Sequence, residues 1–210
     1  NLKNAITYSD NVYFARSALS IGKENLFKYY KNLKIAEKIP FELALNRSQY
    51  INKNQKVNDQ FIADSGYGQG QILMNPLQLA SIYSSFVNEG SIYQPHIVQG
   101  KTKTWIKNVF SKETSQTIKE DLINVIADEK GTGHSIYHDN VTLAGKTGTA
   151  EIKQSQSDTT GTELGWFTVM TTDSKQPLLI TTLVEDVKDR GGSGYVVEHT
   201  KTPLDLYLSK

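Results

Sequence analysis

The chain has 210 residues, of which 38% are hydrophobic, so it is long enough to bury one sizeable core. Its formal net charge at pH 7 is +1, and its basic residues form no stripe of the kind that nucleic acids require, which excludes nucleic acid as a partner. Because it has no cysteine, and no two of its four histidines are spaced as ligands on one helix face, we expect no disulfide, no metal site and no cofactor.

The first two-thirds of the sequence are predicted to be mostly helical. The first clear helix is expected over residues 9–22, where a capping-type Ser-Asp pair stands first and a glycine stands last. Its apolar face is predicted to consist of Val12, Ala15 and Leu19. Three further helices are expected over residues 23–35, 75–90 and 111–131.

The last third of the sequence changes to strand patterns. Runs rich in β-branched and aromatic residues are expected to form strands over residues 142–152, 164–172 and 177–186. A final helix is expected over residues 195–210, interrupted or kinked at Pro203. The fold class is therefore α/β or α+β, with helices first and an antiparallel sheet last.

The stretch LAGKTGTAEI, residues 143–152, combines a lysine with glycines and hydroxyl side chains on a predicted strand. A phosphate-binding loop is a poor interpretation, because Asn140 stands where such a loop requires a glycine. On or beside a sheet edge, Lys146, Thr147 and Thr149 offer a cation, two hydroxyls and free backbone N–H groups to a carboxylate or a carbonyl oxygen. The structural alternative is that Lys146 only protects an edge strand.

A second triplet, Ser9-Asp10-Asn11, stands at the start of the first predicted helix, where the plainest interpretation is an N-cap. Together with residues 146–148, it supplies two of the three signatures of penicillin-binding proteins and class A β-lactamases. The chain resembles the C-terminal part of a class B penicillin-binding protein transpeptidase domain, of the low-affinity Gram-positive type. The resemblance extends through ITYSDNVYFARSAL, DSGYGQGQILMNPLQLASIYSSFVNEG, YQPHIV, GTG, LAGKTGTAE and GWF, so it covers nearly the whole chain.

This resemblance implies the penicillin-binding/β-lactamase-like transpeptidase fold, with residues 1–210 as the C-terminal portion of a single, incomplete domain. It also implies catalytic roles for three residues. Asn11 would hold the substrate's amide, and Ser9 would take part in proton transfer near the nucleophile. Lys146 would support the positive field and the proton network, which fits the need to protonate a departing amine.

Five residues are expected to bind the substrate. In the resemblance, the hydroxyls of Thr147 and Thr149 match those that bind the substrate carboxylate. The backbone N–H of Thr149 matches one half of the oxyanion hole, and Gly148 would matter by being small. The glycine-rich stretch GYGQG lacks the context of a phosphate loop, and we expect it to form a tight turn at the floor of the cleft with Tyr67 or Gln69 near the ligand.

The third signature, serine-x-x-lysine, carries the nucleophile in this family and is expected before Ser9. None of the eight residues before Ser9 is a serine, so the nucleophile is expected outside this chain, which starts without methionine. One match, Ser20 to Lys23, lies after the triplet and straddles the predicted helix stop Gly22. We interpret it as a decoy, because a helical turn that would bring serine and lysine together is broken there.

A second decoy bears on β-lactamases. Glu42, Leu45 and Asn46 match the pattern that in class A β-lactamases carries the glutamate activating the hydrolytic water. The surrounding stretch lacks the proline and the second acid of that loop and has the pattern of a short strand followed by an exposed turn. We therefore interpret Glu42 as structural.

The function that the resemblance implies is a peptidoglycan D,D-transpeptidase, which crosslinks stem peptides through a serine acyl-enzyme and is acylated by β-lactams. A non-catalytic β-lactam or muropeptide sensor and a class A-like β-lactamase are the alternatives. Expected partners are stem peptides, β-lactam antibiotics, the remainder of the same polypeptide and the cell-wall synthesis machinery. No apolar run here approaches the ~18 residues of a membrane helix. The resemblance implies that an N-terminal anchor outside this chain holds the protein at the extracytoplasmic face of the membrane.

Overall fold

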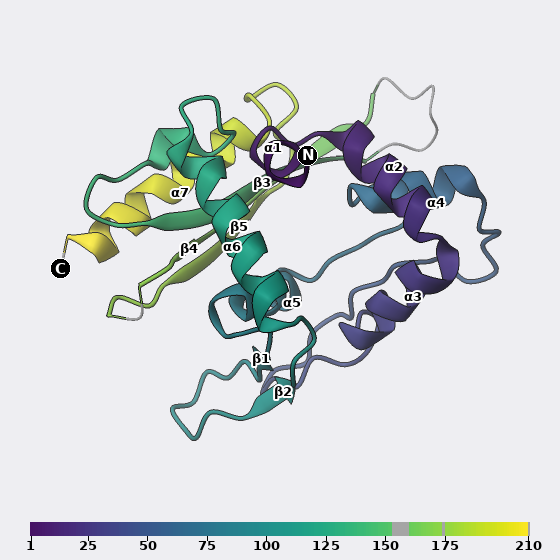
Figure 1. The fold of residues 1–210 in the computed structure, drawn as a ribbon, viewed down its shortest axis with the longest axis horizontal. Helices are drawn as coiled ribbons and strands as arrows, with labels where there is room; N and C mark the ends of the chain where they lie inside the picture. The colour runs from purple at the N-terminus through teal and green to yellow at the C-terminus, as the bar shows by residue number, and fades with distance from the viewer. Residues whose placement is uncertain (153–159, 174, 210) are drawn as a thin grey trace. The chain divides into compact units, whose positions relative to one another are not determined.

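The computed structural model describes residues 1–152, 160–173 and 175–209 (Figure 1). They divide into two compact units. We call Asn1–Ser9 together with Ile118–Lys210 the sheet unit, and Asp10–Thr117 the helical unit. One boundary between the units falls between Ser9 and Asp10, and the other falls within helix α6 (Lys112–Ala127).

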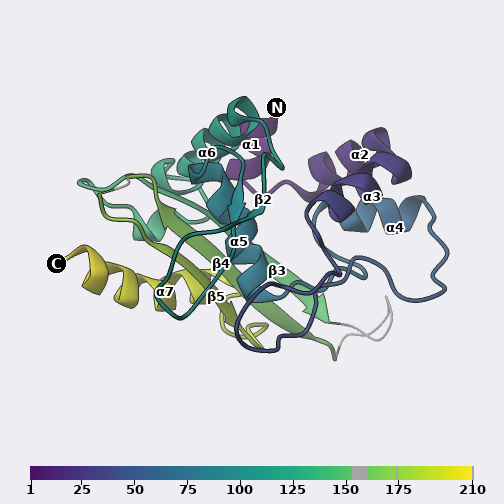
Figure 2. The same cartoon turned by 90° about the horizontal axis from the view of Figure 1, so that it is seen from below.

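In the described residues, the sheet unit is built on three antiparallel strands in the order β3-β4-β5. Their bounds are Leu143–Ile152 for β3, Thr162–Thr171 for β4 and Leu179–Val184 for β5. Helix α7 (Ser193–Leu208) packs against all three strands (Figure 2). The unit also contains α1 (Leu2–Thr7), the 3-10 helix η2 (His134–Ile136) and the C-terminal part of α6. The antiparallel sheet and the final helix predicted from the sequence are confirmed.

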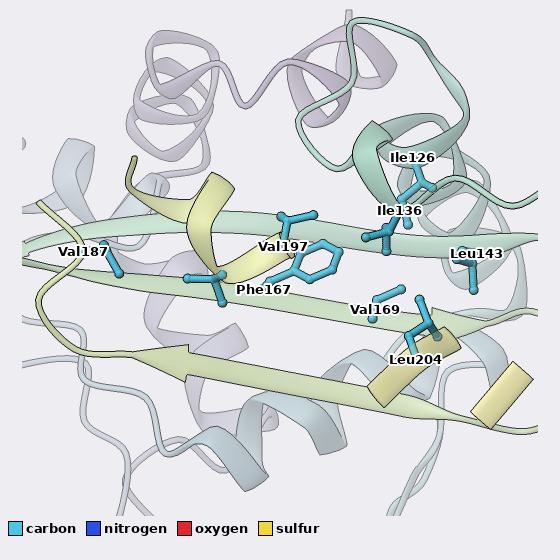
Figure 3. Close-up of a cluster of buried hydrophobic side chains, with 9 residues drawn as sticks. Ile126, Ile136, Leu143, Phe167, Val169, Val187, Val197 and Leu204 are labelled. Carbon is cyan, nitrogen blue, oxygen red and sulfur yellow. The ribbon is translucent and has the colours of Figure 1, made fainter. Parts of the chain in front are cut away.

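Side chains from β3, β4, α6, η2 and α7 form the core of the sheet unit (Figure 3). Phe167 lies at its centre with no exposed surface, and its register places it between Thr147 of β3 and Thr182 of β5. Gly165 allows α7 to approach the sheet, because a Cβ there would lie 2.4 Å from Cγ2 of Val196. The core therefore fixes the strand that carries the lysine motif against the end of α6 and against α7.

Helix α7 continues through Pro203, so the predicted interruption is wrong. A proline inside a helix costs about 3 kcal/mol through a lost hydrogen bond and a steric clash. Here that cost is outweighed by burial, since the helix buries Val196 and Val197 before the proline and Leu204 directly after it. Tertiary packing therefore determines that the helix continues through Pro203, against the preference of the local sequence.

The helical unit consists of four helices, one 3-10 turn and a short hairpin. They are α2 (Asn11–Ile21), α3 (Lys23–Asn32), α4 (Asp59–Gly66), α5 (Pro76–Ser84), η1 (Ser85–Val87), β1 (Ile92–Tyr93) and β2 (Thr104–Ile106). Three predicted helices here and the predicted caps are confirmed: the Asn75 side chain accepts from the N–H of Leu77, and the Ser111 hydroxyl accepts from the N–H of Thr114. Helices α1 and α4, the β1–β2 hairpin and η2 were not predicted.

Two expectations for the helical unit are wrong. The predicted apolar face of α2 is largely turned to solvent, since Val12 is 66% and Leu19 is 42% exposed. The helix instead buries Ala18 and half-buries Phe14, one turn apart, because these two residues meet α4. The short strand expected around Glu42 is also absent from the described residues 40–48, which run as irregular chain before a single bridge between Gln49 and Leu73.

Candidate active site

The lysine of the β3 motif lies against the serine of the other triplet. Nζ of Lys146 donates to Oγ of Ser9 at 2.8 Å, across 137 residues of sequence. It also donates to the backbone oxygen of Thr147 at 3.0 Å. Both residues belong to the sheet unit. The two sequence motifs, far apart along the chain, therefore meet through these side chains.

Ser9 presents its hydroxyl to Lys146 from an unusual backbone conformation. Its φ is +57°, in the left-handed region that residues other than glycine adopt at a cost. Helix α1 ends two residues earlier, at Thr7, and α2 begins two residues later. The N-cap of α2 is Asp10, whose carboxylate accepts from the N–H of Tyr13 at 3.0 Å. The capping interpretation thus holds for Asp10, and it leaves the Ser9 hydroxyl for Lys146.

Lys146 is an unusual lysine because most of its side chain is buried. Burial disfavours the charged ammonium and lowers its pKa from the ordinary 10.5 to about 8. A lysine with a pKa near 8 exists partly as a neutral amine at physiological pH, and this amine can both donate and accept a proton. The group that faces Ser9 is therefore suited to proton transfer.

Among the described strands, β3 lies at one edge of the sheet, so one side of its backbone faces away from β4. Along it, Thr147 is buried and its hydroxyl donates to Oγ1 of Thr132 at 2.7 Å. Thr149 is exposed and lies beside Gly192, where an added Cβ would be 3.5 Å from Oγ1 of Thr149. A Cβ at Gly148 would be 3.5 Å from Cβ of Trp166, which is ordinary contact. The substrate-binding roles of these three residues stay predictions.

The other three predicted site residues belong to the helical unit. Asn11 is exposed and opens α2 directly after its cap. Tyr67 is the C-cap of α4, and its hydroxyl donates to the carboxylate of Asp64 at 2.7 Å. The N–H of Gln69 donates to the backbone oxygen of Asp64 at 2.9 Å, so the predicted tight turn is present. The contact of Tyr67 or Gln69 with a ligand stays a prediction.

The first glycine of GYGQG has a role that the sequence analysis missed. Helices α2 and α4 cross at Gly66, where an added Cβ would lie 2.4 Å from the backbone oxygen of Phe14 and 2.8 Å from Cβ of Ala18. The glycine is therefore a site of close helix approach. It places the cap of α4 and the turn that follows.

We expect Gly66→Ala to destabilise the helical unit by about 1–3 kcal/mol, because the methyl group forces α2 and α4 apart. Amide hydrogen exchange of α2 and α4 measures this loss. Gly194→Ala is the control, since a Cβ at Gly194 would meet nothing within 4 Å. Equal exchange in the two variants would contradict the crossing as the reason for glycine.

The two decoy motifs are placed as expected for structural residues. Ile21 is the last residue of α2 and Lys23 the first of α3, with Gly22 between them at φ +78°, so Ser20 and Lys23 do not share a helical turn. The Glu42 carboxylate accepts from the N–H of Ile97 at 3.2 Å with both oxygens. Backbone hydrogen bonds lower the pKa of this exposed carboxyl. The Glu42 side chain therefore makes a structural contact with the loop that contains Ile97.

Within the described residues, no group of three or more acidic, histidine or cysteine side chains is arranged to hold a metal ion. None of the helices in that part of the chain is both long enough and apolar enough to cross a membrane.

Comparison with known proteins gives a consistent result. Residues 1–202 match the family described as "Penicillin binding protein transpeptidase domain". The chain is 40% identical over 204 residues to "Penicillin-binding protein 3" of Bacillus subtilis, covering 96% of this chain and 30% of that protein. It is 24% identical over 239 residues to "Peptidoglycan D,D-transpeptidase MrdA" of Haemophilus influenzae, covering 100% of this chain and 36% of that protein.

The fold is also found among solved structures. The penicillin-binding protein in "Complex between Penicillin-Binding Protein (PBP2) and MreC from Helicobacter pylori" aligns with a TM-score of 0.76 and 25% identity, covering 97% of this chain and 40% of that chain. The predicted fold class is thereby confirmed, and the chain spans only part of the proteins that it matches, about a third of the two curated relatives.

Proposed function

Since this chain belongs to the penicillin-binding protein transpeptidase domain family, we propose that the whole protein is a peptidoglycan D,D-transpeptidase acting through a serine acyl-enzyme. The observation that carries the proposal is the hydrogen bond of 2.8 Å between Lys146 and Ser9. It joins the two motifs that the family's chemistry requires to act together. The nucleophilic serine is proposed to lie in a part of the protein outside residues 1–210.

The reaction requires two proton transfers at each acylation. In the first transfer, the nucleophile's hydroxyl gives its proton to a neighbouring base while its oxygen adds to the terminal amide carbonyl of a stem peptide. In the second, collapse of the tetrahedral intermediate breaks the C–N bond and the amine takes up a proton. The departing D-alanine amine needs a proton, and a hydroxyl paired with a partly neutral lysine can pass one on. We assign that relay to Ser9 and Lys146. An acceptor amine from a second stem peptide then attacks the ester carbonyl. The ester C–O bond breaks, the amine loses a proton, and the serine oxygen regains one, which completes the crosslink and frees the nucleophile.

A β-lactam enters the same reaction because its ring amide takes the place of the scissile peptide bond. Ring opening leaves the amine attached to the acyl group, so the ester persists. Thr147, Gly148 and Thr149 on the edge strand are proposed to receive the carboxylate of either compound, with Asn11 holding its amide. Tyr67 and Gln69 are proposed to lie along the bound peptide.

Neither alternative has a specific observation in its favour. The two curated relatives carry the names of a penicillin-binding protein and a D,D-transpeptidase, and neither name describes a sensor or a β-lactamase. The Glu42 carboxylate that a class A-like β-lactamase would need is engaged by a backbone N–H. The transpeptidase is therefore the function that we propose.

The proposed partners are stem peptides, β-lactams, the remainder of the same polypeptide and the cell-wall synthesis machinery. The solved relative in complex with MreC supports the last of these. We also propose that the protein acts at the extracytoplasmic face of the cell membrane, where its substrate lies, and that an N-terminal segment outside this chain anchors it.

We expect the full-length protein to form a covalent adduct with a fluorescent penicillin that survives a denaturing gel, and to crosslink stem peptides that end in D-alanyl-D-alanine. Mass spectrometry of the adduct is expected to place the penicillin on a serine outside residues 1–210. Residues 1–210 alone serve as the control and are expected to stay unlabelled. A penicillin bound to Ser20 would contradict the placement of the nucleophile, and rapid release of hydrolysed penicillin would support a β-lactamase.

A further inference from the structure

The segment Asp128–Gly133 joins α6 to η2 in the sheet unit, and the proposed chemistry gives it no role. We call it the clasp. It contains the GTG stretch, which belongs to the resemblance without a function attached to it. Its hydrogen bonds reach residues that directly neighbour Ser9 and Lys146 in sequence.

The clasp first contacts the two residues that precede Ser9. The N–H of Thr132 donates to the backbone oxygen of Thr7 at 3.4 Å. The hydroxyl of Tyr8 donates to Oδ2 of Asp128 at 3.3 Å. Ser9 follows directly and has its φ at +57°. A residue in this conformation is retained only where its surroundings hold it, and these contacts supply that hold from the N-terminal side.

The clasp also contacts the residue that follows Lys146. Oγ1 of Thr132 accepts from Oγ1 of Thr147 at 2.7 Å, and Thr147 is only 6% exposed. Thr132 therefore touches both sides of the pair, Thr7 through its backbone and Thr147 through its hydroxyl. A shift of Thr132 would move the end of α1 relative to β3 and lengthen the contact between Ser9 and Lys146.

The clasp is itself fixed to the end of α6. A Cβ at Gly131 would lie 2.3 Å from the backbone oxygen of Val125, so only glycine allows this approach. The N–H of Gly133 donates to the same oxygen at 3.0 Å, and Nδ1 of His134 lies 2.9 Å from the backbone oxygen of Ile126. The two glycines thus carry Thr132 on a rigid turn.

We propose that the clasp is a positioning element that holds Ser9 against Lys146, and that Thr132 is its positioning residue. Thr132 acts through its neighbours, since its hydrogen bonds in the described residues go to Thr7 and Thr147 and neither goes to Ser9 or Lys146. The effect on reaction rate rests on the proposed transpeptidase function, whereas the effect on the local structure does not.

The test compares three variants of the full-length protein. Thr132→Val removes the hydroxyl and keeps the shape, Thr132→Ser keeps the hydroxyl, and Thr200→Val is the matched control. Thr200 is 1% exposed, and its Oγ1 lies 2.8 Å from both Oγ1 of Thr182 and the backbone oxygen of Val196, so its variant loses a buried threonine pair on the α7 side of the sheet.

Saturation kinetics with a β-lactam separate its dissociation constant from the acylation rate constant. We expect Thr132→Val to lower the acylation rate constant about tenfold, which corresponds to about 1.4 kcal/mol, with the dissociation constant within about twofold. Thr132→Ser is expected to keep most of the rate, and Thr200→Val all of it. Amide hydrogen exchange of residues 7–11 is expected to accelerate in Thr132→Val alone.

A normal rate in Thr132→Val, an equal loss in Thr132→Ser, or the same loss in Thr200→Val would each overturn the proposal. So would unchanged exchange of residues 7–11. A wild-type protein that no β-lactam acylates would instead refute the proposed function. The hydrogen exchange of residues 7–11 in Thr132→Val would then test the role of the clasp without any kinetic measurement.

Discussion

Lys146→Arg is expected to lower the acylation rate of the full-length protein by a factor of about one hundred or more, although the substitution keeps the positive charge. A compact amine fits the buried position 2.8 Å from Ser9, and its pKa of about 8 lets it lose and regain a proton. The guanidinium of arginine is larger and planar, and it keeps its proton at every pH of interest. Stopped-flow measurement of acylation by a fluorescent β-lactam reports the rate directly.

The pH dependence of the wild-type rate provides a second readout of the same residue. Because the folded pKa of Lys146 is lowered to about 8, the neutral amine becomes the major form as pH rises through this value. We expect the acylation rate to rise with pH and to level off above about pH 8. In Lys146→Arg this inflection should be missing, since arginine does not titrate in that range.

The structural alternative for Lys146 makes the opposite prediction. A lysine that only protects an edge strand is replaceable by arginine, and acylation would be unchanged at every pH. Glu42→Gln is the matched control, because this carboxylate contacts the N–H of Ile97 in the helical unit, and we expect both acylation and deacylation to be unaffected. An unaltered rate in Lys146→Arg would remove Lys146 from the active site.

The two motifs of this candidate site were recognisable from sequence because each carries a local signal. The hydrogen bond between Lys146 and Ser9 across 137 residues shows that the motifs meet, and the catalytic roles of both residues stay predictions. The strands were predictable as well, since β-branched runs bounded by turn residues indicate them directly. Thr132 was missed as a positioning residue. Its stretch was recognised, but a threonine between two glycines gives no sign of the hydroxyl that it will meet.

The errors in the helical unit share one physical cause. Apolar periodicity showed that α2 forms, yet it selected Val12 and Leu19 for burial, and both are exposed. The face of α2 that packs is determined by Gly66 of α4, which lies far along the sequence. Because Gly66 has no side chain, Phe14 and Ala18 of α2 can pack closely against α4. Pro203 in α7 is the opposite case. Its local sequence predicts that the helix is interrupted, but core packing keeps the helix continuous. Long-range contacts of this kind have no local sequence pattern.

Phe167→Ala is expected to have the largest effect on stability, lowering the free energy of unfolding of the sheet unit by about 3–5 kcal/mol. Phe167 has no exposed surface and lies in the middle of β4, opposite Thr147 of the lysine motif. Removing the ring leaves a cavity that a three-stranded sheet covered by one long helix cannot fill without moving its strands. Amide hydrogen exchange of β3 and β4 in the full-length protein measures this loss.

The control for this prediction is Leu206→Ala on α7, which is expected to change stability by less than about 0.5 kcal/mol because Leu206 is 65% exposed. A loss below about 1 kcal/mol in Phe167→Ala would contradict its place at the centre of the core.

The ring of Phe167 also lies directly beneath the candidate site. A Cβ added at Gly145 would lie 3.3 Å from Cε2 of Phe167, and one added at Gly133 would lie 3.5 Å from the same atom. The ring therefore lies under the strand that carries Lys146 and under the clasp that carries Thr132. Phe167→Leu, which refills most of the volume, is expected to restore much of the stability and to remain slower in acylation than the wild type. Core packing would then determine the geometry of the proton relay as well as the stability of the fold.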